Sequence, residues 1–323
     1  EHDLPILSFP DWETLPYDLF SPHEDIISTR LRTLSQLPYC DRGILVVPAS
    51  TLMQRLAPVD YAQGSSIALK VSGKLNLDKF TQHLTNAGYH YVSQVMEHGE
   101  FTIRGSLLDL FPMGSQLPYR IDLFDDEIES IRSFDPDNQR TINSTDTINI
   151  LPANEYPLHE EAVKYFRQNY RKRFEGDPQN SAIYRDVSQG NTSGGLEYYL
   201  PLFFPHTCTL NDYLPEKTVI VSLQGAMEGT ESFWQQVLQR YESLRHDVER
   251  PILRPDEIYL SPDEITENIA NIPRADVQWF EYVDDEPNSL TVNYRTSAPP
   301  PLFVQSQAEQ SYTSLTHFLH NFS

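Results

Sequence analysis

The chain has 323 residues, of which 46 are acidic and 24 are basic, and its formal net charge is −22. This charge balance excludes sequence-independent binding of nucleic-acid phosphates by the chain as a whole, because an anionic surface repels an anionic backbone. The length suffices for two or three compact units, so we expect more than one hydrophobic core.

Two further protein classes are excluded. The two cysteines, Cys40 and Cys208, lie far apart in the sequence, which does not fit a disulfide scaffold and fits a reducing compartment. No apolar run approaches the roughly 18 residues of a membrane helix, and the first three residues show no signal-peptide pattern. We therefore expect a soluble protein of the cytoplasm.

The start of the chain predicts half of an α/β domain. A buried strand is expected at 5–9, and a helix at 22–37, with Ser21 as its N-cap and Glu24 three residues later. The run at 43–48 is short and continuously apolar, which is typical of a strand covered on both faces. Strands that alternate with helices predict a parallel sheet with helices packed against it.

A second unit is predicted from residue 66 to residue 152. Ile67, Leu69 and Val71 alternate with small or charged residues, as in a strand with one wet face. The elements expected after it are a helix at 78–86 and strands at 101–111, 119–124 and 128–134. We expect an α+β module, mainly antiparallel, that is inserted into the α/β domain.

The α/β pattern returns from 153 to 295. Ser261 and Glu264 repeat the capping signature of a helix start, and the run at 218–222 predicts another buried strand. A following unit is expected at 296–323, starting near three consecutive prolines. The α/β domain therefore comprises residues 1–65 and 153–295.

No motif for catalysis, a cofactor or a metal stands out. Ser72-Gly73-Lys74-Leu75 lacks the first glycine of a phosphate-binding loop and ends in leucine, which cannot bind magnesium. The acidic runs 125–127 and 284–286 are interpreted as solvated turns. His317 and His320 lie one helical turn apart without a third ligand. We predict no catalytic residue, no cofactor and no metal in this segment.

One strand face carries an unusual combination of residues. Two-residue alternation places Arg120 and Phe124 opposite the core face of the strand at 119–124, and it turns Arg104 outward on a neighbouring strand. Arginine and aromatic residues are enriched at interface hot spots. An alternative remains open, in which Phe124 packs under a loop and the arginines pair with nearby acids.

These residues belong to stretches that resemble a known family. The chain is similar to the amino-terminal UvrB-homology region of bacterial transcription-repair coupling factors (the Mfd family), and the match runs in the same order along nearly the whole chain. The stretches that carry the resemblance are 12–18, 21–23, 51–55, 94–101, 104–105, 109–112, 119–135, 195–198 and 201–204.

The resemblance implies a UvrB-like α/β domain interrupted by a small domain that binds the damage-recognition protein UvrA. It places the UvrA contact on Arg104, Arg120 and Phe124. It also implies that UvrB's nucleotide-binding loop and DNA-clamping hairpin have no counterpart here, so this segment recruits UvrA without catalysis. In the full-length family protein, a separate motor uses ATP and Mg, and RNA polymerase and double-stranded DNA are bound through other domains.

Two alternatives to recruitment are kept. One is an acidic scaffold that packs on the motor and inhibits it, and the other is a UvrB-like module with residual nucleotide or DNA binding. ATP binding by the segment would favour the second alternative.

Overall fold

A computed structural model describes residues 4–64, 66–280 and 292 of the chain. The chain divides into two compact units, residues 1–276 and 277–323. The acidic run 284–286, the pair His317 and His320, and the unit predicted at 296–323 lie outside the described residues.

The first part of the α/β domain contains the predicted strand-helix-strand unit. Strands β1 and β2 pair in parallel, with Ile6 opposite Ile44, and helix α1 connects them. Leu34 of α1 packs with Leu7 and Leu45 of the two strands. The elements are β1 (Ile6–Ser8), α1 (Glu24–Gln36), η1 (Leu37–Tyr39), β2 (Ile44–Val46), α2 (Ala49–Leu52) and α3 (Val59–Gly64).

The prediction that the strand at 43–48 is covered on both faces is wrong. Leu45 faces the core, whereas Ile44 and Val46 on the other face are 48% and 55% exposed. A continuous apolar run predicts a strand, but it does not reveal which of its faces is covered.

The start of α1 also differs from its prediction. The N-cap is His23, whose Nδ1 accepts a hydrogen bond from the backbone N–H of Asp25. The hydroxyl of Ser21 instead donates to Glu197 at 2.9 Å and accepts from the N–H of Gly195. Ser21 therefore bonds to residues distant in sequence and does not cap α1.

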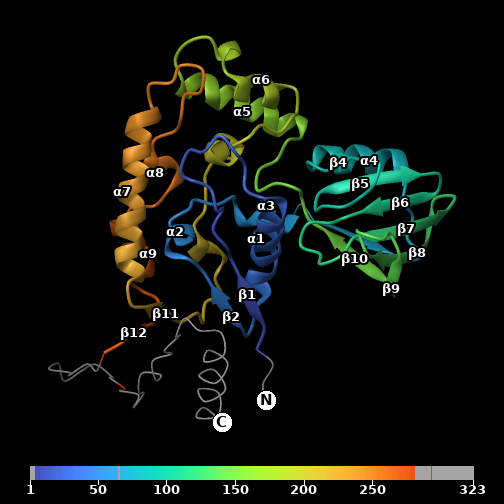
Figure 1. Ribbon diagram of the computed structural model, residues 1–323, viewed down its shortest axis with the longest axis horizontal. Coiled ribbons are helices and arrows are strands. Elements are labelled where there is room, and N and C mark those ends of the chain that lie inside the picture. The colour runs from blue at the N-terminus through green and yellow to red at the C-terminus, as the bar shows by residue number, and fades with distance from the viewer. Residues whose placement is uncertain (1–3, 65, 281–291, 293–323) are drawn as a thin grey trace, which may run out of the picture. The chain divides into compact units, whose positions relative to one another are not determined.

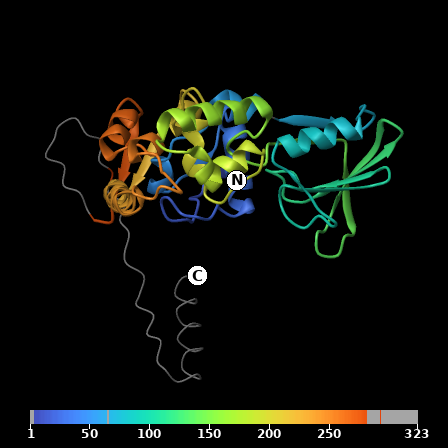
Figure 2. The same ribbon diagram turned by 90° about the horizontal axis from the view of Figure 1, so that it is seen from above.

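Residues 67–150 form the inserted module. The main sheet has six strands in the order β4-β5-β6-β7-β8-β9, antiparallel except for the β4–β5 pair, and β3 pairs with β10 in a separate antiparallel sheet. Figures 1 and 2 show α4 lying against the strands. The elements are β3 (Ile67–Lys70), α4 (Leu77–Asn86), β4 (His90–Tyr91), β5 (Glu100–Arg104), β6 (Leu107–Leu110), β7 (Tyr119–Phe124), β8 (Glu127–Phe134), β9 (Thr141–Thr145) and β10 (Thr147–Ile150).

The single strand predicted at 101–111 is two strands, because a tight turn separates β5 from β6. Gly105 in this turn has φ +65°, a conformation that glycine adopts without steric cost. The predicted fold class is confirmed: a parallel α/β domain is combined with a mainly antiparallel α+β module.

The second part of the α/β domain returns to the first. Leu56 exchanges backbone hydrogen bonds with Cys208, and Gln54 forms a β-bridge with Tyr259. Figure 1 shows the blue first part of the α/β domain beside its yellow and orange second part. The elements are α5 (Glu160–Arg173), η2 (Pro178–Asn180), α6 (Ala182–Ser188), η3 (Leu196–Leu202), η4 (Leu210–Tyr213), β11 (Ile220–Leu223), α7 (Ala226–Leu244), α8 (Pro255–Ile258), α9 (Pro262–Ile269) and β12 (Arg274–Val277).

The capping box predicted at Ser261 and Glu264 is confirmed at the start of α9. The strand predicted at 218–222 is β11, but it is not buried, because Val221 and Leu223 are exposed.

A buried ion pair closes the domain where the chain leaves the inserted module. The Nε of Arg30 in α1 donates to Glu155 at 2.9 Å, and both side chains are almost completely buried. The indole N–H of Trp12 donates to the other oxygen of Glu155 at 2.9 Å. Glu155 therefore holds the exit of the insertion against residues from the start of the chain.

A second buried acid, Glu197, makes stability depend on pH. Burial raises the pKa of Glu197 from 4.5 to about 7. Below about pH 4.5 this carboxyl is neutral in both the folded and the unfolded chain. Between that pH and 7 the folded chain keeps a proton that the unfolded chain releases, so the free energy of unfolding falls as pH rises.

We expect Glu197→Gln to remove this loss, because the amide stays neutral. The difference in the free energy of unfolding between this variant and the wild type should grow by roughly 2–3 kcal/mol, in favour of the variant, from pH 5 to pH 8. Urea unfolding at both pH values measures this difference. Glu216→Gln, a change at an exposed acid, is the control and should keep the wild-type pH dependence. A Glu197→Gln difference that is equal at the two pH values contradicts the assignment.

Candidate functional site

Strand register brings the predicted contact residues to one face of the six-stranded sheet. Asp109 of β6 lies opposite Arg120 of β7, which in turn lies opposite Arg132 of β8. Arg104 at the end of β5 is five residues before Asp109, and the β5–β6 turn brings both to this face. We call the surface formed by Arg104, Asp109, Arg120 and Phe124 the polar face.

The exposure of these side chains differs strongly. Phe124 is 78% exposed at the β7–β8 hairpin, and the Arg104 side chain is 51% exposed. The Arg120 side chain is only 17% exposed, and Asp109 is 1% exposed. The polar face therefore has a buried charged centre, an exposed guanidinium and an exposed aromatic ring.

The buried centre consists of one carboxylate shared by two arginines. Arg120 donates from Nε to Oδ1 of Asp109 at 2.7 Å and from Nη2 to Oδ2 at 2.9 Å, a bidentate arrangement. Arg104 donates from Nη2 to the same Oδ2. Charge-assisted and bidentate hydrogen bonds of this kind are strong and fix geometry.

Further contacts hold Arg120 from its other sides. Its guanidinium lies 4.8 Å from the centre of the Phe134 ring, in a cation–π contact, and Nη1 donates to the carbonyl of Gln139 at 3.4 Å. The hydrogen bond to Asp109 raises the pKa of Arg120 above its ordinary value. Arg120 is therefore charged and held in place.

The prediction from strand alternation is confirmed for Arg104 and Phe124, which point outward. For Arg120 it is confirmed only in part, because the residue lies on the predicted face but is mostly buried under Phe134 and Gln139. The open alternative is also partly correct, since both arginines pair with an acid. Phe124 does not pack under a loop. The role of the three residues in binding stays a prediction.

Sequence reasoning missed Asp109. Its signal is a single acid in a run of leucines, Leu107-Leu108-Asp109-Leu110, within a strand. A lone acid in an apolar strand requires a cationic partner. Identifying that partner needs the strand register, which the sequence does not supply.

The inserted module is attached to α1 close to this sheet. His98 contacts Asp25 through Nδ1 at 2.7 Å and the carbonyl of Ser115 through Nε2 at 2.8 Å. The backbone N–H of Gly114 donates to the hydroxyl of Ser28 at 2.8 Å. These contacts fix the module to the α/β domain at a place separate from the covalent connections.

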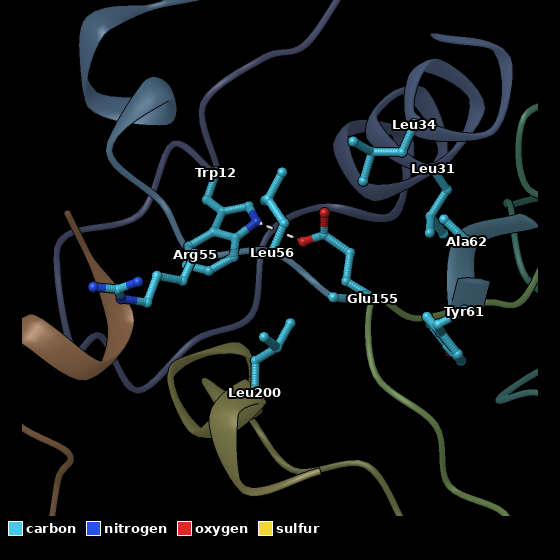
Figure 3. Close-up of a pocket in the computed structure, with 10 residues that line it drawn as sticks. Trp12, Leu31, Leu34, Arg55, Leu56, Tyr61, Ala62, Glu155 and Leu200 are labelled. Carbon is cyan, nitrogen blue, oxygen red and sulfur yellow. Dashed lines mark hydrogen bonds between the residues drawn. The ribbon is translucent and has the colours of Figure 1, made fainter. Parts of the chain in front are cut away.

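The α/β domain contains a small cavity next to the buried ion pair. Figure 3 shows it beside Trp12, Arg55 and Glu155, with the Trp12–Glu155 hydrogen bond crossing its wall. Its volume of about 10 Å³ holds about one water molecule. A nucleotide does not fit into this space.

Other motifs from the sequence have structural roles in the described residues. Gly73 forms a turn, and Lys74 pairs with Asp126 of the acidic run at 3.1 Å. That run is the β7–β8 turn, as predicted. Across the described ranges no three His, Cys, Asp or Glu side chains gather as a metal site. No helix in these ranges combines the length and apolar composition needed to cross a bilayer.

Comparison with known proteins identifies the inserted module. Residues 67–156 match the UvrB interaction domain family. This range contains the six-stranded sheet and the polar face.

Almost the whole chain is also similar to curated proteins. It is 43% identical over 317 residues to the transcription-repair-coupling factor of Haemophilus influenzae, covering 97% of this chain and 27% of that protein. It is 42% identical over 321 residues to that of Escherichia coli, covering 99% and 28%. The corresponding protein of Bacillus subtilis is 29% identical over 233 residues. The chain thus spans about a quarter of the length of the first two.

The geometry of the polar face predicts that Phe124 contributes little to folding. We expect Phe124→Ala to change the free energy of unfolding by less than about 0.5 kcal/mol, because the ring is exposed. Phe134→Ala, its matched control on the next strand, should cost about 3 kcal/mol or more, because that ring is fully buried against Arg120. Urea unfolding measures both values. An equal loss for the two variants would show that Phe124 is part of the core.

Proposed function

Since the chain is homologous to a segment of transcription-repair-coupling factors and contains a UvrB interaction domain, we propose that it is a recruitment module that binds UvrA. The polar face is the contact surface. The segment works by binding rather than catalysis and needs no cofactor of its own. Its role is in nucleotide excision repair, in the bacterial cytoplasm.

One observation carries the proposal: a positively charged and aromatic surface lies inside the matched domain of a strongly acidic chain. Phe124 is a large exposed ring, and Arg104 presents half of its side chain to solvent. Arginines and aromatic rings dominate the binding energy of protein interfaces. A partner with carboxylates and an apolar pocket complements this surface.

The charge of the whole chain supports a protein partner over a nucleic acid. With a net charge of −22, the chain repels phosphate backbones except at local basic sites. The polar face is small and contains a buried acid, so it suits paired carboxylates better than a run of phosphates.

The longer relatives suggest the context of this recruitment. In a full-length coupling factor, the module brings excision repair to RNA polymerase stalled on double-stranded DNA. A motor elsewhere in the protein uses ATP and Mg. Contacts with polymerase and DNA belong to the other domains.

We expect Arg104→Ala and Phe124→Ala each to weaken UvrA binding by about 2 kcal/mol, roughly 30-fold, because each removes an exposed anchor from the interface. Isothermal titration of purified UvrA with the 323-residue chain measures the affinity. Melting temperatures of all variants show that they remain folded.

Arg42→Ala and Tyr39→Ala are the matched controls, since they remove an exposed arginine and an exposed aromatic ring from the α/β domain. Both should bind UvrA as the wild type does. If the wild-type chain does not bind UvrA, or if Arg104→Ala and Phe124→Ala bind normally, recruitment through this face is wrong. That result would favour the alternative function, an acidic scaffold that inhibits the motor.

A further inference from the structure

The polar face contains a buried acid whose presence stability does not explain. Asp109 lies between Leu108 and Leu110 and is itself 1% exposed. Removing a carboxylate from water costs several kcal/mol, and well-packed apolar residues in place of a buried ion pair are often as stable or more so. A leucine at this position would continue the apolar run of β6.

We propose that Asp109 is a positioning residue for partner binding, which holds the guanidinium groups of Arg104 and Arg120 in the orientation that meets the partner's carboxylates. This inference rests on the proposed function of the polar face. Asp109 itself does not touch the partner, because its side chain is buried.

The hydrogen bonds specify how this positioning works. Oδ2 of Asp109 accepts from both arginines, while Oδ1 accepts only from Arg120. The carboxylate therefore lies between two like charges that would otherwise repel each other. Two arginines and one aspartate leave a net charge of +1 on the cluster, and that charge faces outward through Arg104.

Positioning of this kind improves affinity because the side chains are ordered before the partner arrives. A free arginine loses much rotational freedom when it binds a carboxylate, and a preorganised one has already lost it. By contrast, Arg132 pairs with Asp122 at 3.4 Å, and both side chains are partly exposed. Asp109 therefore orders the side chains of Arg104 and Arg120 but not that of Arg132.

Asp109→Asn tests the proposal by removing the negative charge while keeping the shape. We expect the 323-residue chain with this change to bind UvrA at least about tenfold more weakly, because the hydrogen bonds to charged groups are lost or weakened. Glu155→Gln is the matched control, since it breaks another buried acid–arginine pair, Arg30–Glu155, outside the polar face. It should lower the melting temperature and leave the affinity within about twofold of the wild type.

A double-mutant cycle separates positioning from general damage. If Asp109 acts through the arginines, Asp109→Asn should weaken binding by a smaller factor in an Arg104→Met background than in the wild-type chain, and the loss that remains there acts through Arg120. In a Phe124→Ala background it should keep its full effect, because Phe124 makes no contact with Asp109. If Asp109→Asn weakens UvrA binding by the same factor in all backgrounds, Asp109 has only a structural role.

A measurement on the wild-type chain tests the proposal even if Asp109→Asn does not fold. NMR should show slow guanidinium rotation for Arg104 and Arg120 in the absence of UvrA, and fast rotation for the exposed Arg42. Fast rotation of Arg104 and Arg120 overturns the proposal.

The failure of this inference is distinguishable from failure of the proposed function. If Arg104→Ala and Phe124→Ala weaken binding but a folded Asp109→Asn chain binds normally, only the positioning role is wrong. If all three variants bind normally, the proposed contact surface itself is wrong.

Discussion

The polar face depends on one carboxylate that is buried in a sheet and shared by two arginines. Asp109 is neutralised only because β5 and β7 flank β6 in a register that brings Arg104 and Arg120 to its two oxygens. A buried unpaired carboxylate would be strongly destabilising. The need to pair this buried carboxylate therefore links the sheet register to the outward direction of Arg104.

The same principle operates where the inserted module ends. Glu155 follows the last strand of the module and accepts hydrogen bonds from Arg30 and Trp12, which both lie near the start of the chain. The two parts of the α/β domain are thus joined by a buried ion pair as well as by apolar packing.

The two buried acids lie in different parts of the fold, Glu155 in the α/β domain and Asp109 in the inserted module. Beside Glu155 the α/β domain contains a cavity for about one water molecule. The inserted module instead presents Phe124 and Arg104 to solvent. An acidic chain with a local cationic and aromatic surface is suited to selecting one protein partner, because its other surfaces repel anionic competitors.

The sequence by itself determined the features that depend on near neighbours. Alternation in 119–124 predicted which side chains share a face, because successive residues of a strand point to opposite sides. Ser261 and Glu264 predicted a helix start, because the capping box lies within one turn. The inserted fold class followed from the change of pattern, and the resemblance to a family pointed to the three residues that are proposed as the contact.

Only the tertiary structure decided which of these local options are used. Ser21 has the capping sequence but bonds to Glu197, 176 residues away, so the cap passes to His23. Arg120 lies on the predicted face, yet Phe134 and Gln139 cover it. The pairing of Asp109 with two arginines depends on the register of the consecutive strands β5, β6 and β7, which backbone pairing and turn geometry set and which no single strand's sequence encodes.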